Sequence, residues 1–404
     1  MQPPRAFSTQ PRRTFLKSAG WLLGSSALLP SLPAPSQADE SSPRWRVAII
    51  GHTGQGDYGH GHDAAFREHP GFDLVAVADA DEAGRAKARE RLRAPRAYAS
   101  YEEMLTQEHP ALVAIAPRQS AEHHAMASAA LKAGAHLLLE KPFTVTMAEA
   151  DSLLALAQER QRRIAVAHQM RLSPAIQNLH RRLQEKWLGR LISLRAHGKQ
   201  DSRAGGEDLI VLGTHLFDLM RLLAGDPLWC RAEIRSRSHP VTRADIRPAT
   251  ENIGPILGDE IEAQFGFADG VSASFTSRAA LRETLGHWGM TLLCEKGLVR
   301  ILMDVDPHIV WRRTEPSGKS AAVEPWEAVP GDPTSGLPAT DKGFPAANRR
   351  VLADLLEAIA QKRDPVCSGA AGAKALEMAL AIFEAGLSGT RASFPLKNRA
   401  HPLQ

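Results

Sequence analysis

A glycine-rich segment and a later aspartate have the residue types and spacing that could hold a dinucleotide. Residues 51–61 read GHTGQGDYGHG and follow Arg46–Ile50, an apolar run that predicts a buried parallel strand. Glycines allow a tight turn and let a pyrophosphate approach the N–H groups at a helix N-terminus. Asp79 ends a second apolar run, 28 residues after Gly51, where a carboxylate can accept hydrogen bonds from ribose hydroxyls.

Two registers of this loop are compatible with the sequence. Gly54, Gly56 and Gly59 match G-x-G-x-x-G literally, whereas counting from the end of the strand selects Gly51, Thr53 and Gly56. We prefer the second register, because the first glycine should follow the strand directly. The predicted cofactor-binding residues of the loop are therefore Gly51, Thr53, Gly56 and the intervening Gly54.

The polar residues around the loop allow more than one interpretation. Asp79 favours NAD, since its charge would repel a 2′-phosphate, but Arg85 keeps NADP open, and Asp79 could instead cap the next helix. His52, His60 and His62 could hold a metal. Histidines among glycines at a phosphate loop are more simply polar loop residues, so we predict no metal site.

Lys141 lies where a further strand ends. The runs Leu112–Ala116 and His136–Leu139 predict two more buried strands, and the second leads directly into Glu140, Lys141 and Pro142. Ligands of open parallel sheets bind outside the carboxyl ends of the strands, which would place Lys141 at the edge of the cofactor. A surface lysine at a strand end is the alternative. The cofactor-binding prediction at these two strand ends comprises Ala116, Pro117, Glu140, Lys141 and Pro142.

Motifs along the chain resemble the Gfo/Idh/MocA oxidoreductases, the family of glucose-fructose oxidoreductase and inositol dehydrogenase. The resemblance is carried by the glycine loop, by His123, by residues 133–142 (AGAHLLLEKP) and by residues 213–218 (GTHLFD). The stretch 133–142 is its most specific part. The resemblance continues through Asn348-Arg349-Arg350 and covers essentially all of the chain after the first 38 residues.

The resemblance implies an α/β fold in which a Rossmann-type domain precedes an α+β domain with a large, mainly antiparallel sheet. The turn at Asp269-Gly270 between two β-type runs, and another at Lys296-Gly297, independently predict hairpins. Helical spacing over 348–361 and 370–385 predicts two last helices that return to pack on the first domain. We expect a Rossmann domain over 44–168, a substrate and oligomerisation domain over 169–345, and C-terminal helices and tail over 346–404.

Oxidation of a secondary alcohol requires a hydride acceptor, a base and a group that steadies the alcohol oxygen. The resemblance implies that Lys141 and His215 take the last two roles, and an unperturbed imidazole, with a pKa of about 6.5, is a free base near neutrality. The family pattern usually has Asp four residues before this histidine, where this chain has Val211. Asp208 and Asp218, at helical spacings from His215, are the candidates that could replace it near the substrate.

The excess positive charge lies entirely at the N-terminus. The chain of 404 residues has 49 Lys and Arg against 45 Asp and Glu, and residues 1–38 hold four basic residues and no acidic one. Arg12-Arg13 before an interrupted apolar run, followed by Ser36-Gln37-Ala38, resembles a twin-arginine export signal rather than a stable membrane anchor. We therefore expect an exported, periplasmic protein whose remaining chain is formally neutral, which removes the support for nucleic-acid binding.

Three functions remain open at this point. The first is an exported NAD(P)-dependent oxidoreductase that holds its nicotinamide cofactor tightly and acts on a sugar, polyol or derivative, as a homo-oligomer assembled through the second-domain sheet. The second is a glycosidase or lyase that uses bound NAD for a transient oxidation. The third is a binding or scaffolding protein that has lost catalysis, for which Val211 is the argument. Three distant cysteines indicate buried thiols, with one disulfide as the alternative.

Overall fold

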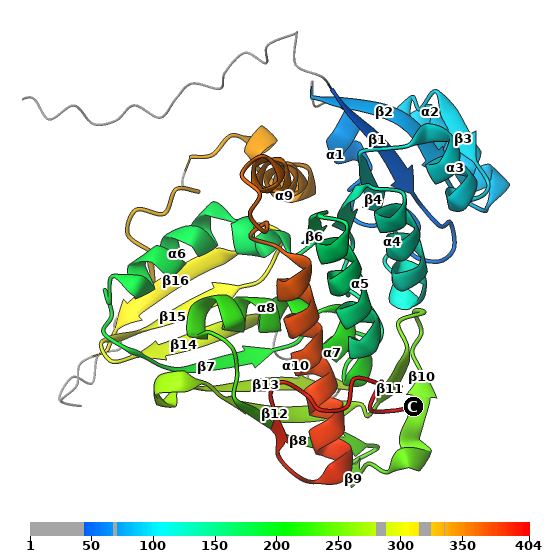
Figure 1. Ribbon diagram of the computed structural model, residues 1–404. Helices are drawn as coiled ribbons and strands as arrows, with labels where there is room; N and C mark the ends of the chain where they lie inside the picture. Colours follow the sequence, from blue (N-terminus) through cyan, green and yellow to red (C-terminus); the bar gives the residue numbers. More distant parts are fainter. Residues whose placement is uncertain (1–43, 68–70, 280–287, 315–324, 335) are drawn as a thin grey trace, which may run out of the picture. The chain divides into compact units, whose positions relative to one another are not determined.

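The first part of the chain folds around a parallel sheet. The computed structural model describes residues 44–67, 71–279, 288–314, 325–334 and 336–404. Six strands pair in parallel in the order β3-β2-β1-β4-β5-β6, the doubly wound order of dinucleotide-binding domains (Figure 1). Their bounds are β1 (Trp45–Ile50), β2 (Phe72–Ala78), β3 (Arg96–Tyr98), β4 (Leu112–Ile115), β5 (His136–Leu139) and β6 (Ile164–Val166).

Helices cover both faces of this sheet because its central strands are apolar on both sides. Alternate residues of β1 enter two different cores: Val47 and Ile49 pack with one set of helices, Ala48 and Ile50 with the other. The first set is α1 (Ala64–Arg67), α2 (Glu82–Leu92) and α9 (Gly343–Ala360); the second includes α3 (Tyr101–Glu108), α4 (His123–Lys132) and α5 (Met147–Glu159). The carboxyl edge of the sheet is thus left to the loops.

The second sheet is mainly antiparallel, as expected. Its strand order is β17-β16-β15-β14-β7-β13-β12-β8-β18, with β9 beside β8, and the β7–β13 pair is parallel. The bounds are β7 (Leu191–His197), β8 (Trp229–Ser236), β9 (His239–Pro240), β12 (Glu260–Gly266), β13 (Ser272–Arg278), β14 (Gly289–Cys294), β15 (Gly297–Leu302), β16 (His308–Arg313), β17 (Glu327–Ala328) and β18 (Ala392–Ser393). A separate hairpin is formed by β10 (Ile246–Pro248) and β11 (Pro255–Leu257).

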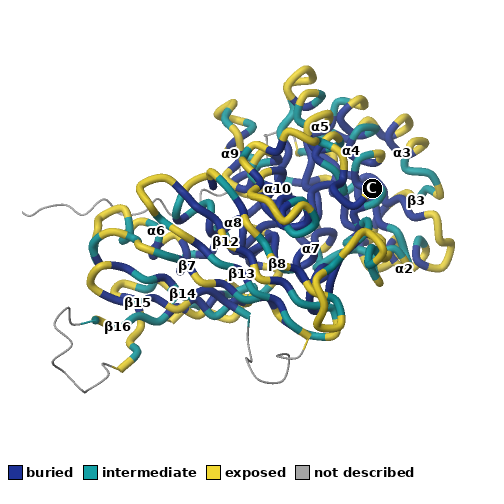
Figure 2. The backbone as a smooth tube through the Cα atoms, turned by 90° about the horizontal axis from the view of Figure 1, so that it is seen from below, coloured by how far each residue is buried: buried dark blue, intermediate teal, exposed yellow. Residues whose placement is uncertain are grey.

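Four helices lie on one side of this sheet or connect it to the first: α6 (Pro174–Gln184), α7 (Gly206–Val211), α8 (Gly213–Ala224) and α10 (Gly369–Ser388). Helix α10 contacts both α8 and β8 and also reaches α5 and β6. Most of its residues are buried, as its largely dark-blue tube shows (Figure 2). The prediction that the last helices return to the first domain is confirmed, and α9 supplies Val351, Leu352 and Leu355 to that domain's core.

Several expectations about local structure can be compared directly with the described residues. Both predicted hairpins are present as β12–β13 and β14–β15, and Asp269 and Gly270 adopt the positive φ angles that such a turn requires. Cys230, Cys294 and Cys367 are buried free thiols. None of the described helices combines the length and apolar character of a membrane span. The export signal expected at residues 1–38 lies outside the described residues.

Candidate functional site

The glycine loop follows β1 directly and folds against the loop after β4. Gly51 is the first residue after the strand, and the choice between the two registers stays a prediction. Gly56 has a φ of 92°, and a Cβ at this position would overlap the backbone nitrogen of Arg118. Two independent constraints therefore require glycine here: a left-handed backbone and a close approach of another segment. Gly54, with a φ of 82°, has open space around it.

Thr53 and Asp79 are hydrogen-bonded to each other. The Thr53 hydroxyl donates to Asp79 Oδ2 at 2.7 Å and its amide to the same carboxylate at 3.2 Å, while the Asp81 amide donates to Oδ1 at 3.0 Å. Helix α2 is capped by Asp81 and not by Asp79, because the Asp81 side chain accepts from the Gly84 amide. Asp79 is thus free of the capping role that was its alternative interpretation.

Two histidines of the glycine loop contact the carboxylate of Glu140. His60 Nδ1 lies 2.7 Å from one carboxylate oxygen and His62 Nε2 lies 2.9 Å from the other. Burial acts to raise the pKa of Glu140, but His62, His60 and Lys141 together hold it well below its usual range. The prediction that Glu140 contacts the cofactor is not supported, because its carboxylate is fully buried and both oxygens are already bonded.

The histidine cluster of the loop has no metal-site geometry in the described part of the chain. No group of three or more His, Cys, Asp or Glu residues there could hold a metal ion. His60 and His62 use their rings to bind Glu140, and His52 pairs with Glu122. These contacts explain the histidines as anchors that fix the loop to the ends of β5 and α4.

The Lys141 ammonium group is buried and points to the end of a helix. Its Nζ donates to the carbonyl of Val211, the last residue of α7, at 3.1 Å. A helix C-terminus presents unpaired carbonyls, which favour a cation. Burial lowers the pKa of Lys141, against the opposing effect of Glu140. Lys141 is therefore oriented by backbone rather than by a carboxylate partner.

His215 lies in the first turn of α8, four residues after Val211, whose carbonyl accepts the hydrogen bond from Lys141. Its ring is 5.3 Å from that of His168 and 5.9 Å from that of Trp288, both in edge-to-face arrangements. Burial, followed by Lys141 and His168, lowers the pKa of His215 well below its usual value, so the imidazole is neutral near pH 7. Its Nδ1 is buried and has no hydrogen-bond partner among the described residues.

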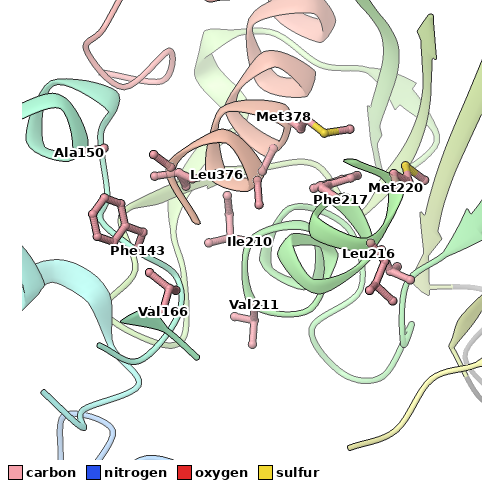
Figure 3. Packing of buried hydrophobic residues seen from close by; sticks show 14 of the residues in the cluster. Phe143, Ala150, Val166, Ile210, Val211, Leu216, Phe217, Met220, Leu376 and Met378 are labelled. Carbon is pink, nitrogen blue, oxygen red and sulfur yellow. The ribbon is translucent and has the colours of Figure 1, made fainter. Parts of the chain in front are cut away.

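One cavity brings the two predicted catalytic residues together. It has a volume of about 370 Å³ and is lined by Lys141 and His215, which are 74 positions apart in the sequence. Val211 lines it as well, and this residue also belongs to the apolar cluster of which Figure 3 shows a part. The aspartate of the family pattern would therefore have stood at the border of this cavity.

Asp208 and Asp218 do not take the place of that missing aspartate. Asp208 accepts hydrogen bonds from the Ser277 hydroxyl and from the amides of Lys199 and Gln200. Asp218 is bound by the Arg171 guanidinium through both carboxylate oxygens. Both are buried, and neither lines the cavity. The geometry gives no support to the expectation that they contact substrate, which stays a prediction, because helical spacing gives the helix region but not the direction of the side chain.

Residues that the sequence analysis did not select also line the cavity. They include Arg118, Lys199, Arg203, Glu251, Trp288, Asp304 and Phe344. Phe344 stacks on His60 at a centroid distance of 4.9 Å. Arg118 could have been found from the sequence, because it directly follows Ala116-Pro117 at the end of a predicted strand. Trp288 was one of several tryptophans, and nothing in its local sequence distinguished it.

His123 fixes the relative position of the two strand ends. Its Nε2 lies 2.8 Å from the carbonyl oxygen of Pro117, and its Nδ1 lies 2.8 Å from that of Pro142. The loops after β4 and β5 are thereby joined through one buried side chain. Ala116, Pro117 and Pro142 are all buried, so any contact that they make with a cofactor involves the backbone surface of these loops.

The residues at the carboxyl edge fit a dinucleotide. A cavity of about 210 Å³ at the ends of β1 and β2 is lined by Gly51, His52 and Asp79, and the glycine loop also reaches the larger cavity through His60. The loop supplies the room that a pyrophosphate needs. Asp79 is buried and bonded to Thr53 and Asp81, as Glu140 is to its histidines, but unlike Glu140 it lines a cavity, so its carboxylate can still accept from ribose hydroxyls. A dinucleotide bound along the loop would extend from the first cavity toward Lys141.

Family models match most of the chain. Residues 45–168 match a model described as "Oxidoreductase family, NAD-binding Rossmann fold", and residues 196–394 match the model for the C-terminal alpha/beta domain of the same oxidoreductase family, Gfo/Idh/MocA. The two matched regions are the parallel-sheet unit and the segment that carries most of the second sheet. The Rossmann match begins at the first residue of β1.

Curated relatives and solved structures agree with this assignment. The chain is 27% identical to D-apiose dehydrogenase of Paraburkholderia graminis over 71% of its own length and 76% of the relative's. It is 28% identical to UDP-N-acetylglucosamine 3-dehydrogenase of Acidithiobacillus ferrooxidans, over 76% and 88%. The structure of levoglucosan dehydrogenase with NADH and L-sorbose has the same fold, with a TM-score of 0.70, 21% identity and coverage of 88% of this chain and all of that one.

Proposed function

Because the chain belongs to the Gfo/Idh/MocA oxidoreductase family and is an NAD-binding oxidoreductase, we propose that it oxidises a secondary alcohol of a sugar-type substrate. The observation that carries this proposal is the cavity in which Lys141 and His215 meet at the carboxyl edge of the Rossmann sheet. Trp288 adds an apolar aromatic surface to the lining, against which a sugar ring can pack. The named relatives act on apiose and on a nucleotide-linked sugar.

In this proposal, Lys141 and His215 have different roles at the alcohol oxygen of the substrate. Bound NAD supplies the acceptor for the hydride that leaves the substrate carbon. The neutral imidazole of His215 accepts the hydroxyl proton. The Lys141 ammonium, held by the Val211 carbonyl, donates a hydrogen bond to the same oxygen and stabilises the negative charge that develops there.

Replacement of His215 by Asn tests the proposed function. We expect the His215→Asn variant to lose at least about 10²-fold in kcat, because general base catalysis is worth about 10²–10⁴-fold, while it still binds NADH. The measurement combines NADH absorbance with product analysis over a panel of sugars and polyols. Full activity of the variant would remove His215 from the mechanism, and product formed without net NADH would favour the glycosidase or lyase alternative.

Replacement of Asp79 tests the cofactor preference. We expect Asp79→Ser to weaken NAD binding by about 10–100-fold, because it removes charge-assisted hydrogen bonds to the ribose, and to improve the relative binding of NADP. Fluorescence titration with NADH and NADPH measures both effects. Since Thr53 also loses its partner, Thr53→Val is the matched control. If Thr53→Val changed the ratio of the two affinities as much as Asp79→Ser, the selectivity would come from the loop and not from the carboxylate.

The pH dependence of kcat/KM tests His215 as the proposed base, and replacement of Val211 should change that dependence. The base acts when neutral, and since the pKa of His215 is lowered from 6.5, kcat/KM is expected to fall only below pH 6.5. Val211→Asp places a carboxylate among the charged and titratable neighbours of the imidazole, which are Lys141, His168, Glu140 and His60. A carboxylate raises the pKa of a nearby histidine.

The acid limb of the pH profile should therefore move to higher pH in Val211→Asp. The uncharged variant Val211→Asn, which has the same shape, should leave the limb in place. The measurement is kcat/KM between pH 5 and 9 for the three proteins. Identical profiles for Val211→Asp and Val211→Asn would exclude His215 as the group that titrates.

A further inference from the structure

The cavity that holds Lys141 and His215 carries more cations than carboxylates. Its lining includes the cations Arg118, Lys141, Lys199 and Arg203 and the carboxylates Glu251 and Asp304. What a ligand would meet depends on which of these charged groups has no partner of opposite sign nearby. The charge of the lining therefore bears on the chemical class of the substrate.

Two of these cations are neutralised by neighbours. Arg203 donates to Asp201 at 2.7 Å and lies 3.3 Å from Glu251, and Lys199 lies 3.7 Å from the same Asp201. The hydrogen bond that Arg203 donates to the Asp201 side chain, together with the charges of Asp201 and Glu251, raises the pKa of Arg203 despite its partial burial. This group of four residues is formally neutral.

Arg118 is different. Among the described residues, its guanidinium has no hydrogen-bond or ion-pair partner, although the side chain lines the cavity. Its backbone, by contrast, is firmly held: the Arg118 amide donates to the Gly56 carbonyl at 3.3 Å, and the preceding carbonyl, of Pro117, is bonded by His123. The unpaired guanidinium thus extends from a loop whose backbone is already fixed, so binding a ligand there does not require the loop to become ordered.

Arg118 lines the cavity in which the substrate and the reacting end of a bound dinucleotide would meet, and not the cavities near the adenosine end of the loop. The cavity at Gly51 and Asp79 does not include Arg118, and neither does a further cavity that Gly54 and Gln55 border. Arg118 and Lys141 line the same space, and Arg118 contributes to the lowered pKa of Lys141. A ligand atom bound by Lys141 therefore lies in the same small cavity as the Arg118 guanidinium.

We propose that the substrate is a sugar acid, whose carboxylate binds Arg118 while the reacting hydroxyl lies between Lys141 and His215. This inference rests on the proposed function. The planar guanidinium matches a carboxylate with two parallel hydrogen bonds. A single unpaired arginine suits a singly charged carboxylate better than a doubly charged phosphate monoester, so sugar phosphates are the alternative that the experiment must separate.

The experiment compares matched substrates with the purified protein. D-glucose, D-galactose and D-mannose, their uronic acids and their 6-phosphates are assayed for NADH formation, and binding to the NADH-loaded protein is measured by titration calorimetry. We expect at least one uronic acid to be preferred over its parent hexose by more than about 10-fold. Arg118→Met should reduce kcat/KM for that acid by about 10–100-fold, and by less than threefold for the hexose. Arg118→Lys, which keeps the charge without the planar fork, should fall between.

Each other outcome contradicts the inference in a distinct way. Preference for hexoses or for 6-phosphates in both turnover and binding overturns the assignment of a carboxylate. Equal losses for acid and hexose in Arg118→Met, or weaker NADH binding in that variant, would assign Arg118 to the cofactor. If the acids bind in the Arg118-dependent manner and nothing is oxidised, the sugar-acid site stands and the proposed dehydrogenase activity fails.

Discussion

Replacement of Lys141 by Met is expected to lower kcat by about 10²–10³-fold while NADH binding stays within about threefold of the wild type. Lys141 is the buried cation nearest to the proposed reaction, and its ammonium is oriented by the Val211 carbonyl at 3.1 Å. Its positive charge matters most when the alcohol oxygen becomes negative, so its loss should affect the rate more than substrate binding. NADH absorbance measures kcat, and fluorescence titration measures the binding of the cofactor.

The chain provides a matched control for this variant. Lys199 lines the same cavity, but it is exposed and lies beside Asp201. We expect Lys199→Met to change kcat by less than about threefold. If Lys141→Met kept most of its activity, or if Lys199→Met lost as much, the role assigned to Lys141 would be wrong.

Replacement of Glu140 by Gln is expected to destabilise the protein by about 3–5 kcal/mol at pH 7. The carboxylate is fully buried, and its oxygens bind His60 and His62. An amide keeps the shape but cannot accept at both ends, and it removes the negative charge that most strongly favours the buried Lys141 ammonium. Urea unfolding followed by circular dichroism measures the free energy of unfolding.

Glu122 is the matched control for Glu140. It also pairs with a histidine of the glycine loop, His52, but the side chain of Glu122 is 44% exposed. We expect Glu122→Gln to cost about 0–1 kcal/mol, as exposed ion pairs usually do. Equal effects of the two substitutions would show that burial of the Glu140 cluster does not contribute to stability as described.

Local patterns predicted the elements that carry the site. Three of the six strands of the parallel sheet were placed to within one residue at each end, and the end of a fourth was predicted correctly, because apolar runs that end at Gly51, Asp79 or Glu140 leave little ambiguity. The preferred glycine register rests on one rule, that the first glycine comes directly after the strand, and it stays a prediction. The positions of Lys141 and His215 came from the family resemblance, since neither a lysine at a strand end nor one histidine among 16 is distinctive by itself.

The contacts that determine the chemistry of the site could not be predicted from the sequence, because they join segments that are far apart in the chain. The pairing of Glu140 with His60 spans 80 positions, and the Lys141 bond to Val211 spans 70 and involves only a backbone carbonyl. No pattern in the sequence predicts which carbonyl a lysine will reach. The contacts of Asp208 and Asp218 could not be predicted for the same reason, since their partners Ser277 and Arg171 lie in other elements.

The most direct test of the account is a crystal structure of the protein with NADH. Our central claim is that the glycine loop and Asp79 hold a dinucleotide whose nicotinamide enters the cavity between Lys141 and His215. The predicted result is an adenosine ribose at Asp79 and a nicotinamide ring facing Lys141, with room beside His215 for a substrate carbon about 3–3.5 Å from the ring. A nicotinamide that lies outside this cavity, or a dinucleotide bound away from the Gly51–Gly56 loop, would contradict the claim.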